Sequence, residues 1–124
     1  MKFTANYVEP YTNSITASVM FANTEENPDE PTFLSLQRPI EFEDSNYYFE
    51  INDQSYSRYG GLELVEFSRS EIVVVLEQSS VEKFDGNEDF RKIQVHFKIN
   101  DAAFADILST LRNIFEGHDI YHEK

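Results

Sequence analysis

Apolar and polar residues alternate along most of this chain, and an alternation with a period of two is typical of strands that are buried on one face. Residues 15–21 and 93–99 show it most clearly, because every odd-numbered residue in both segments is apolar. Shorter apolar segments of strand length occur at residues 33–36, 47–51, 62–67 and 71–77. The chain is therefore predicted to consist mainly of β-sheet.

Turn-forming residues between these segments predict two hairpins. In the first, residues 3–7 pair with residues 15–21 across a turn at residues 9–14, which contains Pro10 and Asn13. In the second, the strands on either side of Ser68–Ser70 pair with each other. Residues 52–59 are polar and are predicted to be a connection that ends at Gly60 and Gly61, where the backbone needs positive φ.

Only the segment near the end of the chain has helical spacing. Asn100 or Asp101 can cap its start, because either side chain can accept a hydrogen bond from a free amide of the first turn. The apolar residues that follow share one helix face: Phe104, Ile107, Leu108, Leu111, Ile114 and Phe115. Gly117 then follows at the place of a left-handed C-terminal cap.

Strands followed by a helix, without regular alternation of the two, argue against a parallel βαβ fold. We predict one α+β domain over residues 1–124, a mostly antiparallel β-sheet with one amphipathic C-terminal helix packed on a sheet face. No apolar stretch approaches the ~20 residues that a membrane-spanning helix needs. The chain has no cysteine, which suits a reducing cytoplasm and excludes disulfides and thiolate metal sites.

The charge of the chain is strongly negative, with 23 acidic against 10 basic residues and a formal net charge of −13. Between residues 3 and 57 the only base is Arg38. Such a surface repels nucleic acid and anionic lipid and attracts basic proteins. We therefore expect neither a nucleic acid nor a membrane as partner. High solubility alone is the alternative explanation of the charge.

Motifs for catalysis or cofactor binding are missing from the sequence, which contains no nucleophile elbow, phosphate-binding loop or dinucleotide fingerprint. His118 and His122 have a spacing that could hold a metal on a helix, but they follow Gly117 in what we expect to be a frayed tail. His96 lies on the polar side of its strand. We predict no catalytic residue, no metal and no cofactor, and hence a protein that is not an enzyme.

Residues 47–61 combine tyrosines with carboxylates and amides, a mixture common in binding surfaces because tyrosine offers a large contact area with a polar tip. Within this stretch, residues 48–54 (YFEINDQ) and 59–63 (YGGLE) resemble the central motif of the immunity protein 10 family of bacterial polymorphic toxin systems. The opening six residues, Ser68–Ser70 and the C-terminal helix fit the same pattern. The resemblance thus covers most of the chain.

The resemblance implies a cytoplasmic protein that binds and neutralises a toxin encoded beside it, without cofactor or catalytic residues. Many toxins of these systems act on nucleic acid through a basic cleft, which an acidic partner can occupy. The cognate toxin domain is accordingly expected to be basic, with a nuclease as one option.

We expect the partner-binding residues to lie in and around residues 47–61. Charge would come from Glu43, Asp44, Glu50 and Asp53, and aromatic anchors from Tyr56 and Tyr59, with Asn52 and Gln54 beside them. The alternative is that some of the tyrosine rings belong to the core and that Asn52, Asp53 and Gln54 only form a turn. Three other interpretations stay open, namely a small-ligand or carbohydrate-binding module, a general mimic of DNA, and a homodimer through an exposed sheet edge.

Overall fold

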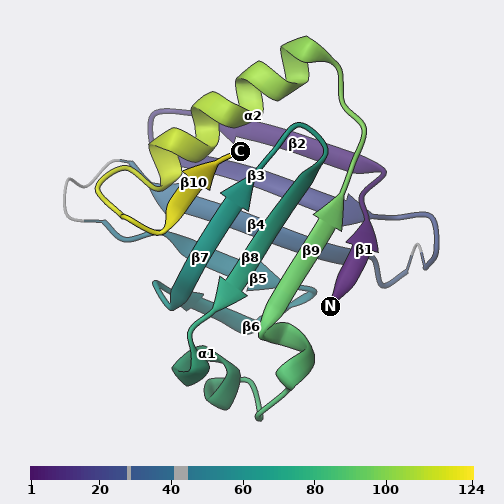
Figure 1. Cartoon of the computed structure of the whole chain (residues 1–124), viewed down its shortest axis with the longest axis vertical. Coiled ribbons are helices and arrows are strands. Elements are labelled where there is room, and N and C mark those ends of the chain that lie inside the picture. The colour runs from purple at the N-terminus through teal and green to yellow at the C-terminus, as the bar shows by residue number, and fades with distance from the viewer. Residues whose placement is uncertain (28, 41–44) are drawn as a thin grey trace.

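The structure, a computed structural model, describes residues 1–27, 29–40 and 45–124. It contains two five-stranded β-sheets whose strands cross at a steep angle (Figure 1). One sheet, which we call the meander sheet, follows chain order and is antiparallel throughout. Its strands are β2 (Tyr7–Thr12), β3 (Thr16–Asn23), β4 (Thr32–Pro39), β5 (Tyr48–Ile51) and β6 (Asp53–Tyr59).

The second sheet, the mixed sheet, has the order β1-β9-β8-β7-β10. Its central strands are antiparallel, whereas the outermost pairs, β1 with β9 and β10 with β7, are parallel. The strands are β1 (Lys2–Thr4), β7 (Leu62–Phe67), β8 (Glu71–Leu76), β9 (Lys92–His96) and β10 (Tyr121–Glu123). A short helix α1 (Gln78–Lys83) and a 3-10 turn η1 (Glu88–Phe90) connect β8 to β9.

The core lies between the two sheets and consists of the residues that alternate inward on their strands. Phe21, Leu34 and Phe49 are fully buried on the inner face of the meander sheet. Phe67 and Val74 are buried opposite them on the mixed sheet. The alternation of apolar residues at 15–21 therefore predicted the correct inner face of β3.

Helix α2 (Asp101–Ile114) packs on the inner face of the meander sheet, beside the mixed sheet, with contacts to β2, β3 and β4 (Figure 1). Asn100 caps it by accepting a hydrogen bond from the Ala103 amide at 2.8 Å. Ile107, Leu111 and Ile114 are completely buried. The predicted α+β fold, mostly antiparallel and with a C-terminal amphipathic helix on a sheet face, is confirmed.

The first hairpin was predicted with the wrong strands. Residues 2–4 form β1, which runs parallel to β9, and the partner of β3 is β2. The turn lies at Asn13, whose side chain accepts hydrogen bonds from the backbone amides of Ile15 and Thr16. Pro10 is part of β2 because this is an edge strand, where a missing N–H need not break the ladder.

Three further segments differ from the prediction. The polar residues after Asn52 form the edge strand β6, and α1 adds a second helix. The strand near residue 93 ends at His96, so residues 97–100 are not part of it. The expected frayed tail forms β10, held by a two-pronged ion pair in which Arg112 contacts the Glu123 carboxylate at 2.6 and 2.8 Å. The described helices include none that is long and apolar enough to span a membrane.

Candidate functional site

The hairpin of β5 and β6 contains most of the residues expected to bind a partner. Phe49 and Ile51 point into the core, so Tyr48 and Glu50 point to the outer face of the meander sheet. The register places Tyr59 opposite Tyr48 and Ser57 opposite Glu50. Glu50 and Tyr59 of the predicted site are thereby brought together on one face.

Tyr48, Glu50 and Tyr59 form a cluster in which the two rings support the carboxylate. The Tyr48 hydroxyl donates a hydrogen bond to Glu50 Oε1 at 2.8 Å, and its ring centroid lies 5.1 Å from that of Tyr59. Burial raises the pKa of Tyr48, and the Glu50 carboxylate raises it further. Tyr48 therefore keeps its proton and continues to hold Glu50, while Tyr59 remains 62% exposed.

Asn52 and Asp53 both form the backbone turn between β5 and β6. Asn52 has a positive φ of 60°, and its side chain accepts a hydrogen bond from the Phe33 amide at 3.0 Å. Asp53 accepts one from the Ser55 amide at 2.7 Å, and this bond lowers the pKa of Asp53. Both residues are exposed, so their turn role leaves them accessible to a partner.

Of the remaining residues of the predicted site, Gln54 lines a hollow together with Tyr48 and Tyr59, whereas Tyr56 does not join them. Gln54 is exposed on β6, while Tyr56 points inward, with its ring 4.9 Å from Phe90 and 5.8 Å from Phe84. Glu43 and Asp44 lie outside the described residues. Tyr56 thus packs on the core side of β6 and shares no face with Tyr59.

No base of the meander sheet reaches its outer face. The only bases in its strands are Arg38 and Arg58, and both point inward. The Arg38 guanidinium donates to the carbonyl of Glu116 at 2.6 Å, and that of Arg58 donates to Ser80 Oγ at 3.0 Å. Within the described strands of the meander sheet, the outer face therefore carries carboxylates and no base, and Lys83 of α1 lines a hollow with Tyr48 and Tyr59 at its β6 edge.

Sequence reasoning missed the tyrosines of β2, although they belong to the same outer face. Tyr7 and Tyr11 are 45% and 57% exposed, and Glu9 lies between them. In the sequence, Tyr7, Glu9 and Tyr11 alternate with Val8 and Pro10, and this alternation indicates a strand with the tyrosines on one face. The prediction missed it because it assigned the residues around Pro10 to a turn.

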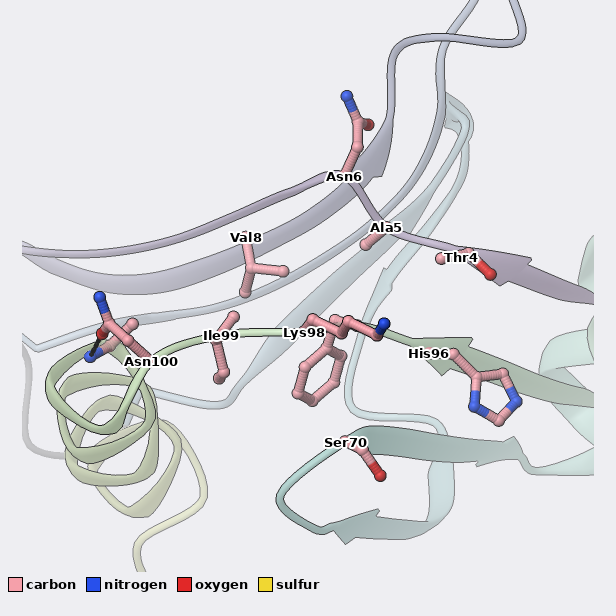
Figure 2. A pocket seen from close by; sticks show the side chains of 11 residues that line it. Thr4, Ala5, Asn6, Val8, Ser70, His96, Lys98, Ile99 and Asn100 are labelled. Carbon is pink, nitrogen blue, oxygen red and sulfur yellow. Dashed lines mark hydrogen bonds between the residues drawn. The ribbon is translucent and has the colours of Figure 1, made fainter.

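A groove of about 930 Å³ lies between the start of β2 and residues 97–100, with Val8 and Ile99 on its opposite sides (Figure 2). Small-ligand sites need polar groups that converge on the ligand. Here Asn100 is engaged in capping α2, and Asn6 exchanges hydrogen bonds with Thr24. His96 lies 3.6 Å from Glu71 and points away from Ile99 in the view. Asn6 and Asn100 are therefore engaged within the fold, and Thr4, Ser70 and Lys98 are the other polar residues that line the groove.

His118 lies against the core, whereas the sequence predicted it in a frayed tail. Its ring makes an edge contact with Tyr47 at 5.0 Å between centroids. Burial lowers the pKa of His118, and the Arg38 charge lowers it further. Within residues 1–27, 29–40 and 45–124, no group of three or more histidines and carboxylates is placed to hold a metal.

Comparison with known proteins adds one finding to this geometry. A family model described as Immunity protein 10 matches residues 4–105, which include the whole β5–β6 hairpin and Gly60-Gly61. Most of α2 and all of β10 lie beyond the match. No curated protein and no solved structure matches the chain significantly.

Proposed function

The chain belongs to the immunity protein 10 family, and from this premise we propose that it neutralises one cognate toxin domain through its acidic, tyrosine-bearing surface. Immunity proteins act by binding a toxin and not by catalysis. The observation that supports this surface is the cluster of half-buried Tyr48 and Glu50 with exposed Tyr59, whose carboxylate is held by the Tyr48 hydroxyl on the outer face of the meander sheet.

The charge of the chain favours a basic toxin. A net charge of −13 steers a basic domain toward the complex and raises the association rate at low salt. Toxins that act on nucleic acid need a basic cleft for phosphates, so we propose a nuclease-like toxin domain. Binding there excludes the substrate, and it takes place in the cytoplasm of the producing cell.

The cluster is organised to contribute affinity as well as steering. Tyr48 holds the Glu50 carboxylate in one position, so less side-chain entropy is lost when a toxin lysine or arginine binds to it. Tyr59 adds contact area around this ion pair and shields it from water. Truncating one partner of such a buried charge pair typically costs ~2–5 kcal/mol of binding free energy.

The test is titration of the purified toxin domain encoded beside the gene of this chain. We expect tight binding by the wild type, and binding at least ~30-fold weaker by Glu50→Gln and Tyr59→Ala, from the lower end of that energy range. A basic nuclease domain from an unrelated system should not bind. Binding to both domains would indicate a general DNA mimic, and no loss in either variant would place the interface elsewhere.

A further inference from the structure

We propose that the toxin-binding surface extends beyond the β5–β6 hairpin over the whole outer face of the meander sheet, as far as the edge strand β2. This inference rests on the proposed function and adds the spacing of the basic residues that the toxin should present to this face. The register of the five strands carries it, because side chains at paired positions lie side by side on one face.

One row of aromatic and polar side chains crosses all five strands. Tyr11 pairs with Ser18, Ser18 with Gln37, Gln37 with Tyr48, and Tyr48 with Tyr59. Tyrosines therefore stand at both ends of the row, on the two edge strands. Gln37 and Ser18 lie between them. The Gln37 amide nitrogen donates a hydrogen bond to Ser35 Oγ at 3.0 Å, and its carbonyl oxygen and the Ser18 hydroxyl can bond to a partner.

A second row runs beside the first and contains the charges. Glu9 pairs with Met20, Met20 with Ser35, Ser35 with Glu50, and Glu50 with Ser57. The two carboxylates are three strands apart, which corresponds to about 14 Å. A third row, from Tyr7 through the buried Ala22 to Phe33, adds the exposed ring of Tyr7 and the half-buried ring of Phe33 on the other side.

In the described part of the chain, the layers that cover the meander sheet lie on its inner face. The mixed sheet and α2 both lie on the inner side of the meander sheet (Figure 1). The large exposed apolar side chains of the described residues are Tyr7, Tyr11, Ile15 and Tyr59. Three of these four stand on the outer face, and a gathering of exposed aromatic residues on one face marks an interaction surface.

The size of the face also favours the wider interface. Two strands are about 10 Å wide and about 20 Å long, which gives roughly 200 Å² of flat area. A stable complex buries about 800 Å² on each partner, so the hairpin alone is too small. The five-stranded face is roughly twice as wide as the hairpin, and the side chains that stand on it increase its accessible area beyond the flat value.

The chemistry of the face specifies its occupant. Glu9 and Glu50, the two carboxylates of this face, match two lysine or arginine side chains about 14 Å apart on the toxin. Tyrosine, glutamine and serine side chains between and around them suit a flat protein surface with backbone and side-chain hydrogen-bonding groups. The toxin should therefore bind across the strands, with one cation at β2 and the other at β5.

The test replaces residues on β2, at the far side of the face from the hairpin. Tyr11→Ala and Glu9→Gln are titrated against the purified toxin domain encoded beside the chain's gene. Asp89→Asn is the matched control, because it removes one exposed carboxylate from η1, outside the meander sheet. Circular dichroism and thermal unfolding establish that each variant is folded.

We expect Tyr11→Ala to weaken binding at least ~10-fold, as an anchor residue does. Glu9→Gln should slow association and reduce its salt dependence, with the Asp89→Asn rate within ~2-fold of wild type. If Glu50→Gln weakens binding while both β2 variants bind like the wild type, this inference is wrong and the proposed function stands. If the wild type itself does not bind the toxin domain, both the proposed function and this inference are wrong. An oligosaccharide that shifts the melting temperature of the protein would then indicate a carbohydrate-binding face.

Discussion

Replacing Gly61 with alanine tests how the candidate site is attached to the rest of the fold. Gly61 has a positive φ of 84°, which an L residue adopts at a cost. A Cβ atom there would lie 2.4 Å from Ser80 Oγ and 2.6 Å from Arg58 Cδ. Ser80 also donates a hydrogen bond to the Gly61 carbonyl at 2.8 Å, so the added methyl group would push apart contacts that join β6, β7 and α1.

The expected cost has two parts. The left-handed backbone costs alanine ~1–2 kcal/mol. Forcing an extra methyl group into occupied space typically costs another ~1–3 kcal/mol. The free energy of unfolding should therefore fall by ~2–5 kcal/mol, a large part of the ~5–15 kcal/mol that stabilises a typical domain.

Urea unfolding followed by circular dichroism measures this cost, and Gly117→Ala is the matched control. Gly117 has almost the same φ, 82°, but a Cβ there would meet no atom within 4 Å. Gly117→Ala should therefore lose only the backbone part, ~1–2 kcal/mol. A Gly61→Ala protein that is no less stable than Gly117→Ala would refute the steric argument.

Three other substitutions have definite expected outcomes. Tyr47→Phe should lower the free energy of unfolding by ~1–3 kcal/mol in urea titration, because it leaves the buried Leu62 amide without its 3.0 Å acceptor; no loss would mean that this amide finds another acceptor. Asn52→Ala should lower the free energy of unfolding by ~1–3 kcal/mol, because it removes the acceptor for the Phe33 amide and places alanine at positive φ. Asn52→Gly should recover the part of this loss that comes from the positive φ, because glycine adopts it without strain. The pKa of His118 is lower in the folded protein than the usual ~6.5, so its contribution to stability is complete above pH ~6.5 and is lost as the pH falls through the pKa of the folded state. His118→Gln should therefore lose less stability than the wild type between pH 7 and pH 5. Parallel pH profiles of the two proteins would contradict this.

The sequence predicted those parts of the fold that depend on local patterns. The alternation at residues 15–21 and 93–99 gave the inner faces of β3 and β9, and the spacing of apolar residues gave α2. The cap at Asn100 and the positive φ of Gly60 and Gly61 also follow from local backbone chemistry.

The missed elements depend on contacts between distant residues. β1 and β10 are three residues long and pair with strands far away in the chain, so no local pattern marks them. Helix α1 has Glu77 at its N-cap position but no capping hydrogen bond from that side chain, and its sequence is mostly polar. These segments take their conformation from the tertiary structure and not from their own propensity.

The candidate site was predicted only in part, for a reason that lies in the hairpin. Asn52 at positive φ and the irregular pairing between Glu50 and Ile51 interrupt the simple alternation. The alternation of β5 therefore cannot be continued along the sequence to tell which residues of β6 face outward. Tyr56 faces inward and Tyr59 faces outward. The tyrosines of β2 could be assigned to the same face only once the strand register was known.

The most direct test of the account is protection of a cell from the toxin. A susceptible strain expresses the toxin domain encoded beside the gene of this chain, with or without the chain itself. The account predicts that growth is restored by the wild type, and restored less or not at all by a folded Glu50→Gln, Tyr59→Ala double variant. Continued growth arrest in the presence of abundant, folded wild-type protein would contradict it.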